Sequence, residues 1–151
     1  MKRLHEGGSS PWLGLMLLAS LIGCEKQPTG EVLPTVPVSG LLTYQGRPLE
    51  YHQLTFSPLD GQRPAVGTSD PEGRFTLGTN RPGDGAVVGT HHVSIVYVGP
   101  PNDDPAFGMN EFDAPPPAKV KIPPKYGSPQ QSGVSIDVPE DGLDDAVIAL
   151  D

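Results

Sequence analysis

Apolar and polar residues alternate along most of the chain after residue 35. Between residues 51 and 57, His52, Leu54 and Phe56 share one parity, and polar side chains occupy most of the other. A period of two places successive side chains on opposite faces of a strand. Short runs of this kind cover residues 36–42, 51–57, 65–69, 74–77, 91–98, 134–138 and 146–150. None of them has the period of an amphipathic helix, so the pattern predicts an all-β fold, a single β-sandwich of about seven strands.

Turn signals lie between these runs. The Gln-Gly pair at residues 45–46 predicts a hairpin that joins the first strand to the second. Residues 70–73 predict a tight turn, in which Asp70 accepts a backbone N–H, Pro71 presets φ and Gly73 takes the left-handed conformation. We expect this turn to join two paired strands. Its acidic residues lack the spacing of an EF-hand, so we interpret them as turn residues and not as calcium ligands.

Positive charge and an apolar run open the chain. Lys2 and Arg3 precede the run at residues 11–22, which is shorter than the roughly 20 residues that cross a bilayer as a helix. The run ends in Leu-Ile-Gly-Cys at residues 21–24, which resembles the lipobox of bacterial lipoproteins. This resemblance implies acylation of Cys24, the only cysteine, and cleavage before it. A plain secretory signal and an uncleaved anchor are the alternatives.

We therefore divide the chain into three parts. Residues 1–23 are expected to be a lipoprotein signal peptide, residues 24–35 the lipidated N-terminus with a flexible tether, and residues 36–151 the domain. The formal net charge is −8 for the whole chain and −9 without residues 1–23. Such a charge argues against nucleic acid and anionic lipid headgroups as partners. With its one cysteine acylated, the domain has no disulfide and depends on its hydrophobic core.

Five segments of the domain combine turn residues with strand residues in a way that can be compared with a known family. They are 38–49 (VSGLLTYQGRPL), 69–77 (SDPEGRFTL), 82–90 (PGDGAVVGT), 122–128 (IPPKYGS) and 132–134 (SGV). Together they resemble the carboxypeptidase regulatory-like domain, in the version found in small bacterial envelope lipoproteins. The resemblance implies a transthyretin-like Greek-key sandwich over most of residues 36–150. Because the matching positions are mostly turn and core residues, they specify a fold and not an activity.

The candidate catalytic residues do not form a known pattern. Hydroxyisourate hydrolase shares the transthyretin-like fold, but this chain lacks the Tyr-Arg-Gly-Ser ending of that enzyme. His91 and His92 are adjacent on a predicted strand, so their rings point to opposite faces and cannot bind one metal together. We expect His91 to pack at the sandwich edge and His92 to face solvent. The sequence has no Gly-x-Ser-x-Gly elbow and no P-loop, so we predict no enzyme activity, no cofactor and no metal site.

Residues 99–124 are the least regular part of the predicted domain. Eight prolines in these 26 residues exclude regular structure. Phe107, Met109 and Phe112 lie there among acidic residues, which makes them candidate contacts for a partner. In the alternative interpretation they fold back over a sheet edge and shield it from strand addition.

These observations predict a non-enzymatic, lipid-anchored protein of the cell envelope that acts as a binding or structural module. It is expected to face the periplasm or the cell surface, with the membrane and an envelope protein or glycan as partners, and no nucleic acid. A carbohydrate-binding sandwich is the alternative. The candidate stacking residues for a sugar are Tyr44, Tyr51, Tyr97 and Tyr126. A hydrolase with an unrecognised site, acting through His91, is the third hypothesis.

Overall fold

The computed structural model describes residues 30–101 and 114–151. The compact unit in this part of the chain runs from Glu31 to Asp151. Four residues to which the sequence assigns a role lie outside the described residues: Cys24, Phe107, Met109 and Phe112. Their roles therefore stay predictions.

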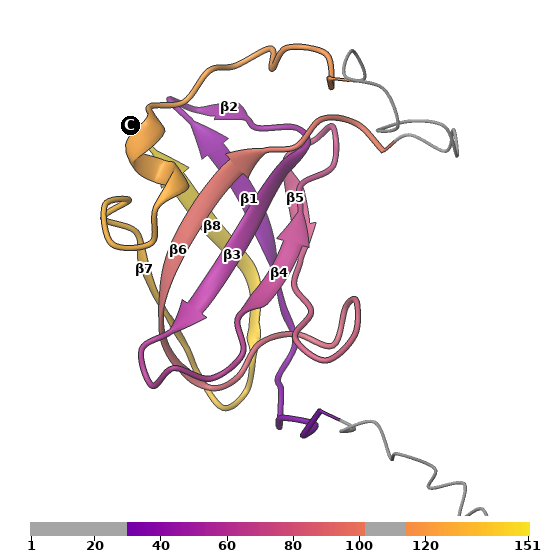
Figure 1. Cartoon of the computed structure of the whole chain (residues 1–151), viewed down its shortest axis with the longest axis vertical. Helices are drawn as coiled ribbons and strands as arrows, with labels where there is room; N and C mark the ends of the chain where they lie inside the picture. Colours follow the sequence, from indigo (N-terminus) through magenta and orange to yellow (C-terminus); the bar gives the residue numbers. More distant parts are fainter. Residues whose placement is uncertain (1–29, 102–113) are drawn as a thin grey trace, which may run out of the picture. The chain divides into compact units, whose positions relative to one another are not determined.

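Eight strands and one short 3-10 helix make up the described residues (Figure 1). They are β1 (Val38–Tyr44), β2 (Arg47–Pro48), β3 (His52–Pro58), β4 (Ala65–Thr68), β5 (Arg74–Thr76), β6 (Gly89–Tyr97), η1 (Pro124–Gly127), β7 (Ser135–Val138) and β8 (Leu143–Leu150). Residues 30–101 and 114–151 contain no α-helix. The strands form two four-stranded sheets in a sandwich-like arrangement, which confirms the predicted all-β sandwich.

The first sheet is built around β1. β8 runs parallel to β1 on one side, while β5 and β2 pair antiparallel with successive parts of its other side. β1 and β8 approach closely because Gly40 lies opposite Ala146, where a Cβ would overlap the carbonyl oxygen of Ala146. The second sheet has the strand order β4-β3-β6-β7 and is antiparallel throughout.

The hairpin predicted at residues 45–46 is only partly correct. Gln45 and Gly46 have positive φ values of 48° and 76°, as a tight two-residue turn requires. The strand that follows in the hairpin is the short β2, which pairs at Thr43 and Tyr44. The chain then bends at Tyr51, which has φ 56°, and β3 enters the other sheet. The expected pairing of the first two long strands is therefore wrong, because β2 completes the hairpin before β3 begins.

The turn predicted at residues 70–73 is present, but it connects the two sheets. Asp70 Oδ1 accepts the backbone N–H groups of Glu72 at 3.0 Å and Arg74 at 2.8 Å, and Gly73 has φ 80°. β4 before the turn pairs with β3, whereas β5 after it pairs with β1. The expected hairpin is therefore only partly correct: Val66 and Gly78 exchange two backbone hydrogen bonds of 2.9 Å, but β4 and β5 form their ladders in different sheets. Turn chemistry sets the reversal of the chain, while burial of each strand's apolar face decides its partner.

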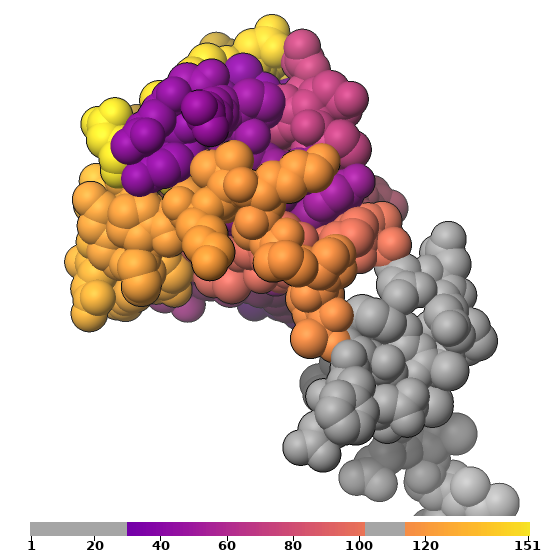
Figure 2. Space-filling model, turned by 90° about the horizontal axis from the view of Figure 1, so that it is seen from above, coloured from indigo at the N-terminus to yellow at the C-terminus, as the bar shows by residue number. Residues whose placement is uncertain are grey.

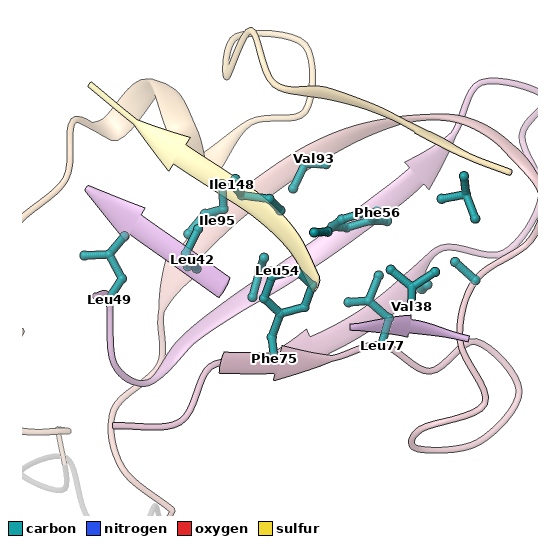
Figure 3. Close-up of a cluster of buried hydrophobic side chains, with 14 of the residues drawn as sticks. Val38, Leu42, Leu49, Leu54, Phe56, Phe75, Leu77, Val93, Ile95 and Ile148 are labelled. Atoms are coloured by element: carbon teal, nitrogen blue, oxygen red, sulfur yellow. The ribbon is translucent and has the colours of Figure 1, made fainter. Parts of the chain in front are cut away.

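The core lies between the inner faces of the two sheets (Figure 3). β1 and β3 both begin with alternating buried and half-buried residues, as the sequence pattern predicts. The largest fully buried apolar side chains are Phe56, Leu42, Leu49, Leu54, Leu77 and Ile95. Burying a side chain of this size stabilises a fold by about 1.5–3 kcal/mol relative to leaving it exposed. This cluster is the main source of stability in a chain with a single cysteine.

The strand directions give the sandwich two distinct ends. β1 starts beside the point where the chain enters the compact unit, and it runs toward the end that carries η1 and the C-terminus (Figure 1). We call the first the entry end. The second is the strap end, named after the proline-rich strap, residues 114–123, that crosses it. Figure 2 looks down on the strap end, where the strap and η1 (orange) spread over the tips of the strands.

Candidate functional site

A groove of about 430 Å³ lies at the strap end, between the second half of β6, the strap and η1. Ile95, Val96 and Tyr97 form its β6 side. Val120 and Ile122 of the strap line the other side, and both are partly buried against the core. A concave, mostly apolar surface with few polar groups is typical of a binding site. The groove is therefore the candidate functional site.

Two smaller hollows extend the groove across the strap end. One, of about 210 Å³, lies beside Glu50, His52 and Lys119. The other, of about 340 Å³, lies beside Tyr51 and Tyr97. Each hollow shares lining residues with the groove or with the other hollow. The strap end thus carries one connected, indented surface.

Among the described residues, two polar contacts tie the strap to β6 and to the segment before β3. The Tyr97 hydroxyl donates to the carbonyl oxygen of Pro116 at 2.8 Å. The Lys119 ammonium lies 2.9 Å from a Glu50 carboxylate oxygen, and its hydrogen bond to this carboxylate raises the pKa of Lys119. The Lys119 side chain is nevertheless 79% exposed, so water screens the ion pair and the tie is weak.

His52 is the buried histidine of this surface. It is 1% exposed, its Nδ1 lies 2.8 Å from the carbonyl oxygen of Glu50, and its ring meets that of Tyr97 edge-on, with 5.3 Å between the centroids. Burial lowers the pKa of His52 and outweighs the hydrogen bond and negative charge of Glu50, which act to raise it. The ring is therefore neutral at pH 7 and donates from Nδ1 to Glu50. Nε2 is left as an acceptor without a partner in the described residues.

The backbone of His52 is fixed by Ser69, which is equally buried. His52 N–H donates to Ser69 Oγ at 2.9 Å, and Ser69 N–H donates to the His52 carbonyl oxygen at 2.9 Å. The inward orientation of His52 with Leu54 and Phe56 was predicted from their shared parity and is confirmed. Its place in the groove was missed, because the strap beside it lies far along the chain. A histidine among apolar residues of one strand face was the only local signal.

The adjacent histidines of β6 lie on opposite faces, as predicted. His91 is fully buried beside Phe56, and its Nε2 lies 2.8 Å from the carbonyl oxygen of Val87. His92 is half-buried on the outer face. His91 therefore holds the loop before β6 and does not line the groove. Within residues 30–101 and 114–151, His, Cys, Asp and Glu side chains form no group of three or more that could hold a metal ion.

Two of the four candidate stacking tyrosines face the indented surface. Tyr51 and Tyr97 line the same hollow. Tyr126 is only 4% exposed, and its hydroxyl donates to the carbonyl oxygen of Asp151 at 2.8 Å. Tyr44 is partly buried against the core. The structure therefore brings Tyr51 and Tyr97 together and assigns the other two to packing.

The entry end is closed by hydrogen bonds around Asp84 and Asn80. The Asp84 carboxylate accepts the backbone N–H groups of Thr79, Asn80 and Arg81 and the side-chain amide of Asn80. Burial acts to raise the pKa of Asp84, but these hydrogen bonds outweigh it and hold the pKa below its ordinary value. The Asn80 side chain also pairs with the backbone of Leu33 in both directions, at 2.9 and 3.0 Å.

Further bonds attach the segment before β1 to this end. The Arg63 guanidinium donates to Asn80 Oδ1 and to the carbonyl oxygen of Glu31, both at 3.3 Å. Val36 and Ala86 exchange two backbone hydrogen bonds, at 2.9 and 3.0 Å. Residues 31–35, which the sequence placed in the tether, are therefore attached to the folded unit.

Comparison with known proteins identifies no relative. No protein-family model, no curated protein and no solved structure matches the chain. None of the helical segments in the described residues is long and apolar enough to cross a membrane. The function must therefore be inferred from the residues and geometry of the chain itself.

Proposed function

We propose that this chain is a non-enzymatic, lipid-anchored binding module of the bacterial cell envelope, facing the periplasm or the cell surface. The lipobox-like residues 21–24 support the anchor at Cys24. Glu31 lies seven positions after Cys24, a span of at most about 25 Å when extended. Such a tether keeps the domain close to the membrane and raises its local concentration near envelope partners.

The strand directions support an orientation in which the entry end faces the membrane and the groove faces away from it. The segment at residue 31 is attached to the entry end through Arg63 and Asn80. β1 leads from there to the strap end over 7 residues, a rise of roughly 23 Å. A lipid at Cys24 therefore draws the entry end toward the membrane. The groove lies at the opposite end, where an envelope protein or glycan can reach it.

For residues 36–151 we propose a carboxypeptidase regulatory-like domain with transthyretin-like Greek-key topology. The resembling segments fall at turns and core positions of the sandwich. Gly46 and Gly73 both have positive φ, and Val38, Phe75 and Leu77 are buried. These positions support the family for its fold and say nothing of an activity.

The histidines favour binding over catalysis. His52 and His91 each direct one ring nitrogen to a backbone carbonyl oxygen, those of Glu50 and Val87. The other ring nitrogen of each has no hydrogen-bond partner in the described residues. A histidine that activates a serine, threonine or cysteine needs that hydroxyl or thiol within hydrogen-bond reach, and none lies there among the described residues. The hypothesis of a hydrolase acting through His91 gains no support from this geometry.

Carbohydrate binding is the second candidate, favoured by Tyr51 and Tyr97. Their shared hollow is also lined by Pro71 and Pro100, so it offers flat apolar surfaces. Sugar rings stack on such surfaces through their C–H faces. Binding on a glycan array that is lost in both Tyr51→Ala and Tyr97→Ala, with the urea unfolding midpoint unchanged, supports this candidate.

Labelling and quenching test the anchor and the orientation separately. Palmitate labelling and membrane fractionation are expected for the chain and lost in Cys24→Ala. In vesicles with a quencher at the bilayer surface, a dye on Leu59→Cys at the entry end is expected to be quenched more than one on Gln45→Cys at the strap end. Both positions are exposed. An unlabelled chain contradicts the anchor, and equal quenching contradicts the orientation.

A further inference from the structure

Among residues 30–101 and 114–151, no strand pairs with the outer edge of the second half of β6. β7 pairs with β6 only from Gly89 to His92. Val93 N–H donates to the carbonyl oxygen of Val134 at 3.0 Å, so the odd-numbered residues of β6 direct their backbone groups toward the β7 side. The N–H and C=O groups of Ile95 and Tyr97 therefore point past the end of β7, toward the strap and η1.

The ladder stops because the chain before β7 turns away. Gly133 has φ 69°, and the N–H of Val134 donates to Ser132 Oγ at 3.2 Å instead of to Val93. In the described residues, no hydrogen bond engages the carbonyl oxygen of Val93 or the N–H and C=O groups of Ile95 and Tyr97. A strand edge with free groups at every second residue is a template for another strand.

The strap covers this edge without replacing the missing strand. Val93 and Ile95 are 0% and 1% exposed, so their free backbone groups are out of reach of water. Pro123 and Pro124 have no N–H to donate, and no strap residue makes a backbone hydrogen bond to β6 within the described residues. Buried backbone groups without partners are rare and destabilising. The unpaired backbone groups of Val93 and Ile95 lie under a strap with few polar contacts. This edge of β6 therefore indicates a binding site in which another segment supplies the missing hydrogen bonds.

The lysines of residues 30–101 and 114–151 all lie on the strap or on η1, the segments beside this edge. They are Lys119, Lys121 and Lys125, and residues 114–136 contain no acidic residue, although the whole chain has a net charge of −8. Lys121 lines the groove, Lys119 reaches Glu50, and the Lys125 ammonium lies 4.7 Å from the centroid of the Tyr126 ring. This local positive charge favours a partner that carries carboxylates.

From these observations we infer that the strap end binds an extended, acidic peptide segment of an envelope protein, which adds as a strand to the free edge of β6. The inference rests on the proposed binding function. The peptide backbone supplies partners for the N–H and C=O groups of Ile95 and Tyr97. Its carboxylates meet Lys121 and take over Lys119 from Glu50, which releases the exposed tie of the strap and lets it move outward.

Amide hydrogen exchange measured by NMR on the full lipidated chain tests the pairing. The chain is placed in phosphatidylcholine nanodiscs, and acetyl-(Glu-Val)3-amide is the probe. At saturating peptide, exchange at the Ile95 and Tyr97 N–H groups is expected to slow at least about tenfold. Exchange at Leu42 on the other sheet, whose N–H already donates to Gly73, is expected to stay the same.

Two matched peptides separate backbone pairing from charge. The (Glu-Val)3 peptide with alternate N-methyl groups keeps the charge and loses the hydrogen bonds of one edge. The (Lys-Val)3 peptide keeps the backbone and reverses the charge. Each is expected to bind roughly tenfold or more weakly than the acidic probe. Equal binding of the N-methylated peptide overturns strand addition.

Three substitutions in the protein test the proposed peptide-binding edge of β6, one of them as a control. Lys121→Glu is expected to weaken binding of the acidic peptide roughly tenfold. Arg81→Glu makes the same change of charge at the entry end and is expected to leave binding unchanged. Tyr97→Phe removes the hydrogen bond that the Tyr97 hydroxyl donates to Pro116 of the strap, so it is expected to raise the affinity about threefold, because opening the strap then costs less. Unchanged or weaker binding by Tyr97→Phe contradicts displacement of the strap.

The remaining outcomes identify a different occupant. Slow exchange at Ile95 in the peptide-free chain that depends on protein concentration assigns the edge to a second copy. Binding of a neutral glycan that Tyr51→Ala abolishes, without binding of the acidic peptide, assigns the surface to sugars. Palmitate labelling of the same preparation reports on the anchor independently. An unlabelled chain that binds the peptide overturns the anchor alone, and a labelled chain that does not bind overturns this inference alone.

Discussion

The two ends of the sandwich satisfy their polar groups to different degrees. At the entry end, Asp84 and Asn80 accept and donate hydrogen bonds that attach the loops and the backbone of Leu33. At the strap end, His52 Nε2 and the backbone groups of Ile95 have no partner in the described residues. Unpaired buried polar groups are costly. Apart from His91 Nδ1 in the first half of β6, those named for the described residues lie toward the strap end, which points to a ligand there. The entry end, where these polar groups are paired, is suited to holding the chain. The strap end, where polar groups lack partners, is suited to binding.

A substitution at Gly85, in the entry end, has the largest expected effect on stability. Gly85 has φ 90°, and a Cβ there would overlap the carbonyl oxygen of Val36, in the contact that attaches the segment before β1. We expect Gly85→Ala to lower the free energy of unfolding by about 3–4 kcal/mol in urea titrations.

Gly83→Ala is the matched control for this change. Gly83 has φ 81°, but no atom lies within 4 Å of its added Cβ. The cost is then about 1 kcal/mol, that of the left-handed backbone alone. Equal losses in the two variants would show that close packing at the entry end does not matter.

Removing the Asp84 carboxylate tests how much the hydrogen bonds of the entry end contribute to stability. Asp84→Ala leaves the N–H groups of Thr79 and Asn80 without their acceptor, and we expect a loss of about 1–2 kcal/mol. Asp60→Ala, on an exposed loop of the same end, is the control and should change stability by less than about 0.5 kcal/mol. A loss in Asp84→Ala no larger than that of the control contradicts the role of the network.

The strap end is expected to respond to pH through His52. Burial lowers the pKa of His52, so the unfolded chain takes up the proton first. The fold therefore loses stability as the pH falls below the ordinary value of 6.5 and through the folded value, with a slope of at most about 1.4 kcal/mol per pH unit. Urea unfolding at pH 7.5 and 5.5 should show a larger difference for the native chain than for His52→Gln. Equal differences would assign the pH dependence to other groups.

The weak tie of the strap has the smallest expected effect on stability. Because the Lys119 side chain is largely exposed, Lys119→Ala should not measurably shift the urea midpoint. The same variant should exchange the Ile95 amide faster, since the strap opens more readily. A clear drop in the midpoint without faster exchange would mean that the strap is a fixed part of the core.

Strand positions were predictable from the sequence, but strand partners were not. Alternation located the inward residues of β3, because a period of two is a local property of the chain. The turns at residues 45–46 and 70–73 were also recognisable from their residue types. Both were assigned the wrong pairing, because a turn states where the chain reverses and not which sheet receives the next strand.

The candidate site was the least predictable part of the described residues. The sequence drew attention to His91 and four tyrosines. Of these, the structure brings Tyr97 to the groove, together with His52 and Lys121. The strap that lines this groove lies within residues 99–124, for which the sequence predicts no regular structure, and no period or motif indicates where it packs. The local signals were a histidine with inward parity and a lysine-rich segment in an acidic chain. Neither signal indicates which residues lie beside it in the folded structure.

By itself the sequence determined the all-β class, the turns, the acidic charge and the lipobox-like end of the apolar run. Each of these depends on residues that are close together along the chain, so the order of residue types is sufficient. Only the tertiary structure decided that, within the part of the chain it describes, the edge of β6 has no partner at Ile95, and that His52 is buried beside the strap. Whether a polar group finds a hydrogen-bond partner depends on segments far apart in sequence, whose meeting no local pattern records.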